Sequence, residues 1–234
     1  MRINKYLSAC GICSRREADL LVGSGRVTID GVPAERNSQA DEDSCVCLDG
    51  RRVSLPVQKT YLKLYKPTGI ECTFDRRVKQ NLGDYLHLDT RLAYAGRLDK
   101  NSEGLLILTD DGDLIQHMMA ARYAHEKEYE VTVNKPLTDA FLREMAAGVF
   151  LRELEVTTRP CRIRETGENR FRIVLTQGLN RQIRRMCEAL GFRVRSLRRV
   201  RIVNVRLGDM QPGERRPLTE EEREELLRLV MGKD

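Results

Sequence analysis

Apolar and polar positions along residues 1–48 predict two short helices followed by strands. The segment "RINKYLSACG" has apolar residues at helical spacing and stops before Gly11, a common helix terminator. Ser14 precedes a second helical run and is followed three residues later by Glu17, which is the pattern of a capping box. In "RVTIDGVPA" an Asp-Gly pair between two apolar runs predicts a hairpin. These elements predict a small separate domain over residues 1–48.

The remainder of the chain mixes strand-like and helical patterns. Strands are predicted in "TYLKLYK", "HEKEYEVTV", "RFRIVLTQG" and "VRSLRRVRIVNVRL", and helices in "NLGDYLHL", "GDLIQHMMAAR", "TDAFLREMAAGV", "NRQIRRMCEALGF" and "LTEEEREELLRLV". Because strands and helices do not alternate regularly, we expect an α+β fold with a large mixed, mostly antiparallel sheet flanked by helices. A polar stretch over residues 49–58 is interpreted as a linker, which leaves residues 59–234 for the larger domain.

The net charge of the chain and the distribution of its arginines indicate which kind of partner it binds. The chain carries a net charge of +6, and between Arg181 and Arg201 eight arginines stand against one acid, Glu188. Like charges at this density repel one another unless a polyanion lies beside them, and the planar guanidinium suits phosphate contacts and stacking. We therefore expect the run from Arg181 to Arg201 to bind a polyanion, with a solvated helix face as the alternative. The strand over residues 193–201 would then supply affinity for the backbone of that polyanion.

The same sequence excludes other classes of protein. No apolar run approaches the ~18 residues of a membrane span, and the N-terminus carries no secretion signal, so we expect a cytoplasmic protein without membrane contact. Cys10 and Cys13, together with Cys45 and Cys47, offer thiols to zinc. Their different local patterns favour structural thiols instead, and no metal is expected.

One charged cluster stands directly before a buried strand. In "AGRLDKNSEGLLILTDDGDL", Asp99 occupies a turn that precedes the apolar run Leu105–Leu108. A structural aspartate in a turn is the simplest interpretation. The sequence has no phosphate-binding glycine loop, no His-Glu-x-x-His and no nucleophile elbow. If the protein is an enzyme, its reacting group is therefore a carboxylate in a basic environment.

These segments resemble a known family in order and content. "RINKYLSACGICSRREADLLVGSGRVTIDGVPA" is similar to the S-four RNA-binding domain. "KLYKPTGIECT", "GRLDKNSEGLLILTDDGDL", "HEKEYEVTV" and "GLNRQIRRMCEALGFRVRSLRRVRI" resemble, in the same order, blocks of the pseudouridine synthases of the RsuA branch. The resemblance spans essentially the whole chain. Two of the segments look most like a member of this branch that acts on the large ribosomal subunit.

The resemblance implies an activity and a set of partners. Such an enzyme isomerises a uridine within RNA to pseudouridine, needs no metal or other cofactor, and flips the target base out of its stack. Large-subunit ribosomal RNA is the expected substrate, and a monomer is the expected state. Small-subunit ribosomal RNA, transfer RNA and a non-catalytic RNA-binding role remain as alternatives.

The resemblance also implies roles for particular residues. Asp99 matches the catalytic aspartate, Arg184 the arginine that pairs with it, and Tyr129 the tyrosine that stacks on the uracil. Alternative roles are a phosphate contact for Arg184 and a core position for Tyr129. Further expected RNA contacts are Arg97, which would fill the place of the flipped base, Ile183, a wall beside the base, and Lys66, Arg181, Arg2, Lys5, Arg15, Arg16 and Arg26.

Overall fold

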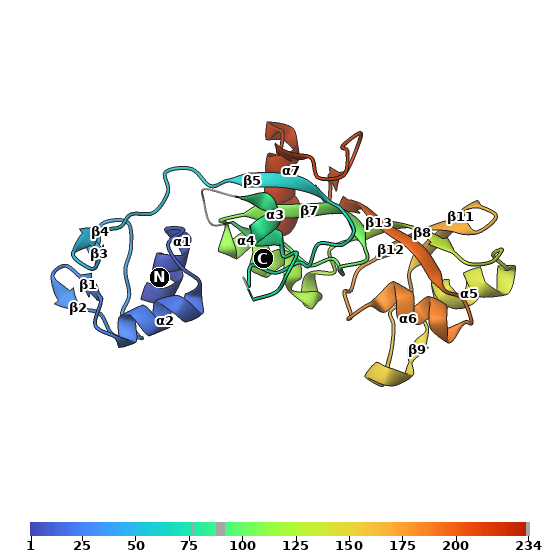
Figure 1. Cartoon of the computed structure of the whole chain (residues 1–234), viewed down its shortest axis with the longest axis horizontal. Helices are drawn as coiled ribbons and strands as arrows, with labels where there is room; N and C mark the ends of the chain where they lie inside the picture. The colour runs from blue at the N-terminus through green and yellow to red at the C-terminus, as the bar shows by residue number, and fades with distance from the viewer. Residues whose placement is uncertain (76, 88–91, 233–234) are drawn as a thin grey trace. The chain divides into compact units, whose positions relative to one another are not determined.

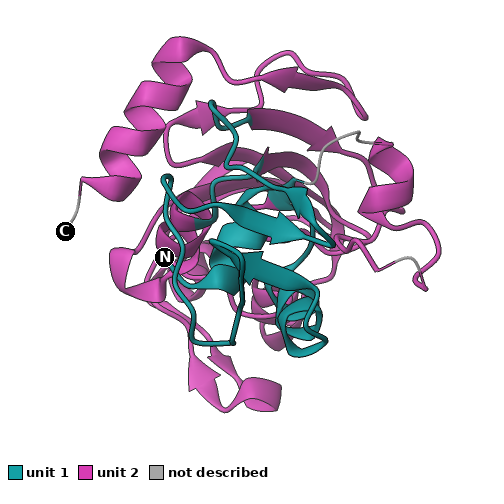
Figure 2. Cartoon of the chain, turned by 90° about the vertical axis from the view of Figure 1, so that its left-hand side faces the viewer, with its two compact units in different colours: residues 1–60, 88–93, 109–112 teal, residues 61–87, 94–108, 113–234 magenta. Residues whose placement is uncertain are grey.

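The computed structural model describes residues 1–75, 77–87 and 92–232 of the chain. These residues group into two compact units, which Figure 2 shows in separate colours. The first contains residues 1–60, 92–93 and 109–112, and the second contains residues 61–75, 77–87, 94–108 and 113–232. The helix predicted in "NLGDYLHL" extends to residue 88, which lies outside the described residues.

The N-terminal unit begins with the two predicted helices, α1 (Ile3–Ala9) and α2 (Arg15–Gly23). The expected capping box is confirmed: the Glu17 backbone N–H donates to Ser14 Oγ at 3.2 Å, and the Ser14 N–H donates to the Glu17 carboxylate at 2.7 Å. The hairpin of β1 (Val27–Ile29) and β2 (Val32–Pro33) turns at Asp30 and Gly31, both with positive φ. This backbone is the turn type that Asp-Gly favours.

The sheet of this unit extends past the predicted domain boundary at residue 48. Its strand order is β2-β1-β3-β4, in which β3 is Val46–Leu48 and β4 is Arg51–Arg52. Val53 and Leu55 then pack against the same core. Residues 51–55 therefore belong to the small unit, although the polar composition of residues 49–58 indicated a linker. The pairing of β4 with β3 and the packing of Val53 and Leu55 place these residues in the small unit despite their polar surroundings in the sequence.

The second unit is built on one long mixed sheet with the strand order β11-β12-β8-β13-β7-β5-β15. The strands are β5 (Tyr61–Lys66), β7 (Glu103–Thr109), β8 (Lys127–Val133), β11 (Arg162–Gly167), β12 (Arg170–Leu175), β13 (Val194–Ile202) and β15 (Arg215–Pro217). β6 (Ala93–Tyr94) pairs with β7, and β14 (Val205–Arg206) pairs with β13. β13 and β7 run parallel, whereas β8 is antiparallel to both of its neighbours. The predicted mixed, mostly antiparallel sheet is thus confirmed.

Helices and a small ribbon complete the unit. The helices are α3 (Leu82–Leu86), α4 (Gly112–Met119), α5 (Asp139–Ala147), α6 (Gln182–Ala189) and α7 (Glu220–Met231), with short 3₁₀ turns at Ala121–Tyr123 and Arg152–Leu154. β9 (Phe150–Leu151) and β10 (Val156–Thr157) form the ribbon. Thr138 and Thr219 stand directly before α5 and α7 and cap them with their side chains.

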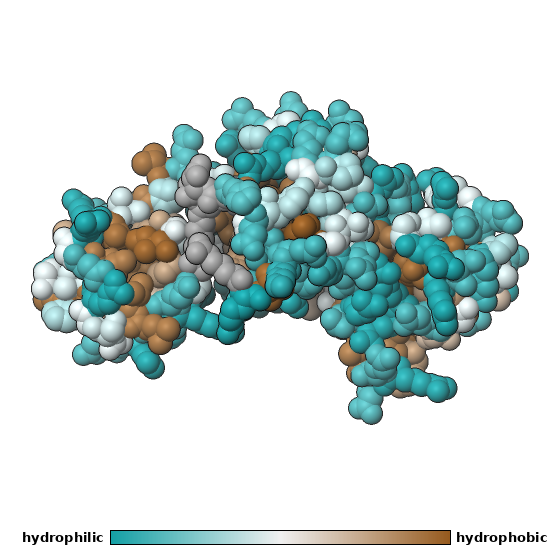
Figure 3. Space-filling model, in the orientation of Figure 1, coloured by the Kyte–Doolittle hydropathy of each residue, from teal (hydrophilic) through white to brown (hydrophobic). Residues whose placement is uncertain are grey.

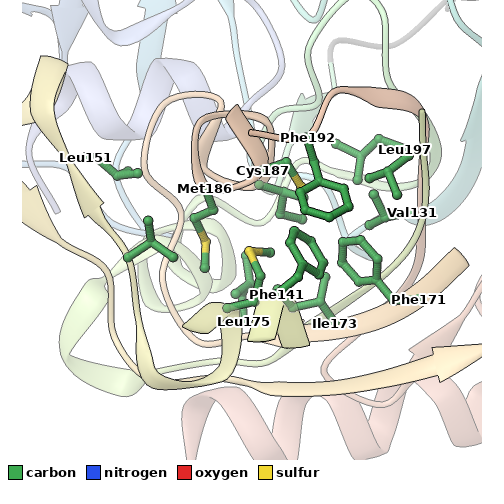
Figure 4. Close-up of a cluster of buried hydrophobic side chains, with 14 residues drawn as sticks. Val131, Phe141, Leu151, Phe171, Ile173, Leu175, Met186, Cys187, Phe192 and Leu197 are labelled. Carbon is green, nitrogen blue, oxygen red and sulfur yellow. The ribbon is translucent and has the colours of Figure 1, made fainter. Parts of the chain in front are cut away.

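One face of the sheet is covered by α5 and α6, which lie on the same side of β8, β12 and β13 (Figure 1). Phe141 of α5 and Met186 of α6 meet Val131 and Phe171 of the strands in the cluster that Figure 4 shows. Burying a side chain of this size contributes about 1.5–3 kcal/mol. The cluster therefore holds α6 against the strands that carry Tyr129.

The opposite face is covered in a different part of the sheet. There α7 packs on β5 and β7, where Leu226 and Val230 meet Leu105 and Ile107. On this side β11, β12, β8 and β13 carry mostly charged and hydroxyl side chains, among them Arg164, Arg172, Glu130, Arg198, Thr132 and Ser196. We call this charged part the reverse face. Hydrophilic side chains also prevail on the visible surface in Figure 3.

The chain contains all seven cysteines as thiols, and burial raises the pKa of Cys187 to about 12. Within the described ranges no three His, Cys, Asp or Glu side chains gather as metal ligands. Nor do those ranges contain a helix long and apolar enough to span a bilayer.

Candidate active site

Asp99 lies in the loop between β6 and β7, at the start of a tight turn. The Ser102 N–H donates to the Asp99 carbonyl at 3.0 Å, and the Gly69 N–H donates to the Lys100 carbonyl at 2.8 Å. The turn is therefore held by itself and by the segment that follows β5. The Asp99 side chain remains 31% exposed. Hydrogen bonds thus fix the backbone of the turn, while the Asp99 carboxylate is accessible to a ligand.

Lys66 stabilises the turn through hydrogen bonds from its ammonium group. Its Nζ donates to the Pro67 carbonyl at 2.7 Å and to the Ser102 carbonyl at 2.9 Å, and its side chain is fully buried. Burial lowers the pKa of Lys66. The sequence predicts an RNA contact for Lys66. An ammonium that is buried and bonded to two carbonyls cannot reach RNA, so this assignment is corrected to support of the Asp99 loop.

A glycine lets β7 and β13 approach closely beside the turn. Gly104 has φ +109°, and a Cβ there would lie 2.3 Å from the Arg199 carbonyl oxygen. Only a residue without a side chain fits this contact and this backbone conformation. The close approach sets β13 beside the Asp99 loop. It also allows buried Arg199 to donate from Nε to the Leu105 carbonyl at 2.8 Å and from Nη1 to the Arg97 carbonyl at 3.3 Å.

Arg184 reaches the same loop from α6. Its Nη2 donates to the Asn101 carbonyl at 2.8 Å and to Ser102 Oγ at 3.1 Å. Its Nε lies 3.9 Å from Asp99 Oδ2, and among the described residues this buried Nε has no hydrogen-bond partner. The tertiary structure thus brings together the two residues that were expected to pair. Ser102, only 1% exposed, links them and was missed by the sequence analysis.

The surroundings of Arg184 shift its pKa in opposite directions. Burial and the neighbouring Arg181 lower the pKa of Arg184, while the Asp99 carboxylate acts to raise it. A guanidinium stays charged in proteins because its pKa begins above 12. A positive Nε with an unused proton therefore faces the Asp99 carboxylate. Hydrogen bonds of this kind are often long before substrate binds and shorten in the complex.

Tyr129 stands on the helix-covered face of the sheet. In the strand register it lies opposite Ile173 of β12 and Arg199 of β13. It is half-buried and packs against the hydrophobic cluster. Because Arg199 also pairs with Gly104 of β7, Tyr129 is two strands from the strand that follows Asp99. Tyr129 therefore lies on the same face of the sheet as Gly104, which follows Asp99 by five residues.

The other residues that were predicted to contact RNA differ in how exposed they are. Arg97 and Arg181 are exposed, one in the Asp99 loop and the other directly before α6. Ile183 is 4% exposed and belongs to the hydrophobic cluster, so its side chain anchors α6 and is not presented to RNA. In the small unit Arg2, Arg15 and Arg16 are exposed and Lys5 is half-buried, whereas Arg26 donates from Nε to Asp49 Oδ1 at 2.8 Å.

The arginine-rich segment is not a uniform RNA-binding surface. Arg201 pairs with Glu128 at 2.9 Å, Arg198 pairs with Glu130, Arg185 pairs with Glu153, and Arg199 is 1% exposed. The expectation that residues 193–201 together bind backbone is therefore too broad. Glutamates from the neighbouring strand, distant in sequence, neutralise part of the run.

Comparison with known proteins agrees with this geometry. Residues 60–189 match the model of the RNA pseudouridylate synthase family, and residues 1–40 match that of the S4 domain. A crystal structure titled as a pseudouridylate synthase superposes with a TM-score of 0.71 at 28% identity, covering 97% of this chain and 99% of that one.

Curated relatives extend the match over nearly the full chain. The dual-specificity RNA pseudouridine synthase RluF of Salmonella typhi is 44% identical over 99% of this chain and 80% of its own length. RluF of Escherichia coli K12 is 42% identical over 98% of this chain and 79% of its own. An uncharacterised RNA pseudouridine synthase of Aquifex aeolicus is 35% identical over 98% of both chains. The chain therefore belongs to the RsuA-type RNA pseudouridine synthases that carry an S4 domain, and it is an isomerase acting on RNA.

Proposed function

We propose that this chain converts a uridine of large-subunit ribosomal RNA to pseudouridine, with Asp99 as the reacting group. The observation that carries the proposal is the partly exposed Asp99 carboxylate, 3.9 Å from the buried, unsatisfied Arg184 Nε. The relatives named RluF are described as having dual specificity. We propose that this chain likewise accepts a second class of RNA. It would act as a cytoplasmic monomer.

The proposed reaction rearranges one nucleotide without any external reactant. The bond between uracil N1 and the sugar C1′ breaks, the detached uracil rotates, and a bond forms between C5 and C1′. The proton on C5 is released to solvent, and N1 takes up a proton. Asp99 acts either as a nucleophile or as a base at the sugar, and both roles require its ionised form. The Arg184 guanidinium places a positive charge 3.9 Å from the Asp99 carboxylate.

Access to the base requires that the uridine leaves its stack, which costs a few kcal/mol. Arg97 is exposed two residues before Asp99, and a flat guanidinium can stack where the base had been. Tyr129 would stack on the flipped uracil. Arg2, Lys5, Arg15 and Arg16 of the small unit would contact phosphates, which position RNA without reading its sequence.

Tritium release tests the reaction directly. RNA carrying tritium at uracil C5 loses it to water when pseudouridine forms. We expect release from large-subunit RNA with the unaltered chain and none with Asp99→Asn, because an amide cannot act as nucleophile or base. Release from small-subunit RNA or transfer RNA instead would reassign the substrate. Tight binding with no release from any RNA would favour the non-catalytic role.

A deletion tests the small unit. Without residues 1–55 the affinity for substrate RNA should fall, while turnover at saturating RNA persists, because Asp99, Tyr129 and Arg184 all lie in the second unit. Unchanged affinity would remove docking from the role of this unit.

A further inference from the structure

The reverse face carries a row of charges that the active site does not use. Strand register places Arg164 of β11 beside Arg172 of β12, Arg172 beside Glu130 of β8, Glu130 beside Arg198 of β13, and Arg198 beside Glu103 of β7. Adjacent strands are about 4.8 Å apart. The row from β11 to β13 therefore spans roughly 14 Å. It lies on the side of the sheet opposite to Tyr129, because neighbouring residues in a strand point to opposite faces.

The row borders an open hollow of about 470 Å³. Its lining also includes Arg170 and the hydroxyl residues Thr132, Thr166 and Ser196. Four arginines thus surround the hollow, against Glu103 and Glu130. Arginines and hydroxyls are the side chains that most often bind phosphate and sugar oxygens.

The arginines are not balanced by the acids. Arg172 Nη2 lies 2.5 Å from Glu130 Oε1, and Arg198 Nε lies 3.1 Å from Glu130 Oε2. Glu130 therefore serves two guanidinium groups. Arg172 Nη1 also lies 3.7 Å from Glu128 Oε1, but Glu128 is shared with Arg201. Arg164 and Arg170 are exposed, and neither makes an ion pair with another described residue. A sheet face selected only for solubility would intersperse both signs of charge.

We infer that the reverse face is a docking surface for the backbone of the RNA substrate, outside the stem that enters the active site. The charge excess, the hollow and the hydroxyls fit a phosphodiester backbone. β11 is a terminal strand of the sheet, so a folded RNA reaching around this edge can contact both faces. This inference rests on the proposed action on large structured RNA. An acidic segment of another protein would meet the same charges and is an outcome of the test.

The test compares two double variants that remove equal charge. Arg164→Gln with Arg170→Gln removes the two unpaired arginines of the reverse face. Arg143→Gln with Arg228→Gln removes two exposed arginines from α5 and α7, outside the hollow. The dissociation constant for the RNA that the unaltered chain turns over is measured at several salt concentrations, together with kcat at saturating RNA.

We expect the reverse-face variant to bind about tenfold more weakly than the control, with kcat unchanged. Its plot of log affinity against log salt concentration should be shallower by about one to two units, because fewer counterions are released. A short hairpin that carries only the target stem should bind both variants equally, because it is too small to reach the reverse face.

Equal affinity and equal salt dependence of the two variants would overturn the inference. So would an equal loss on the short hairpin, which would indicate a general field effect. A loss seen only with ribosomal particles, and not with naked RNA, would assign the face to a protein. If the unaltered chain releases no tritium from any RNA, the proposed function fails. If the unaltered chain releases tritium but the two double variants bind the RNA with equal affinity, the proposed function stands and only the inference about the reverse face fails.

Discussion

Arg184 Nε lies 3.9 Å from Asp99 Oδ2, while Nη2 of the same guanidinium is bonded to Asn101 and Ser102. The arginine thus holds the loop with one edge and faces the carboxylate with another. One side chain thus contributes both to the position of the loop and to the charge of the site. α6, which carries it, packs against the sheet through the hydrophobic cluster.

Replacement of Arg184 by lysine should lower kcat by about 10²–10³. Lysine keeps the charge but lacks the planar fork that makes two kinds of contact at once. Arg185→Lys, one position along α6 and paired with Glu153, is the control and should change kcat less than twofold. Tritium release under saturating RNA measures both. Full activity of Arg184→Lys would show that charge alone is needed at this position.

Ser102→Ala should reduce kcat about tenfold, and the loss of a buried hydrogen bond should also destabilise the fold. The change removes the hydroxyl that accepts from Arg184 Nη2, and a hydrogen bond to a charged group is worth about 1.5–3 kcal/mol. Exposed Ser54 offers the control Ser54→Ala. Single-turnover rates separate chemistry from RNA binding. An unaltered rate would mean that the Asn101 carbonyl suffices to place the guanidinium.

Gly104→Ala should destabilise the fold by about 2–4 kcal/mol, because a side chain at φ +109° is strained and its Cβ would collide with the Arg199 backbone. Gly112→Ala is the control, since no atom lies within 4 Å of the added Cβ. Urea unfolding gives both free energies. Similar stability of the two variants would contradict the close approach of β7 and β13.

Lys127 predicts a pH dependence of stability. Burial and, to a smaller extent, Arg199 lower the pKa of Lys127 to about 8, below its value of 10.5 in the unfolded chain. Between these two pH values the unfolded chain binds more protons, so the contribution of Lys127 to stability rises with pH. Below pH 8 the full cost of burying the charge is present. The shift corresponds to roughly 3 kcal/mol at most.

Lys127→Met removes this dependence. We expect the difference in unfolding free energy between the variant and the unaltered chain to shrink from pH 8 to pH 10.5. The raised pKa values of the buried thiols affect both proteins equally and cancel in the difference. Exposed Lys79→Met is the control and should give a constant difference. A constant difference for Lys127→Met as well would place its ammonium in solvent.

The sequence alone determined the family and the types of element, and it predicted Asp99 as the reacting residue. Capping boxes, an Asp-Gly turn and apolar periodicity are local, so Ser14, Thr219 and the strand after Asp99 were predictable from their neighbours. The order of the motif blocks predicted Asp99 and Arg184 as site residues through the resemblance to the family. Local composition failed at residues 51–55, because their strand partner and hydrophobic neighbours lie elsewhere in the small unit.

The tertiary structure decided which charged residues are available to RNA. Lys66, Arg198, Arg199 and Arg201 look alike in the sequence as exposed cations. Strand register sets glutamates of β8 against Arg198 and Arg201, and close packing buries Lys66 and Arg199 against carbonyls of the Asp99 loop and β7. Burial and pairing depend on residues 36 to 102 positions away. A charge can be counted from sequence, but its partner is chosen only when distant strands meet.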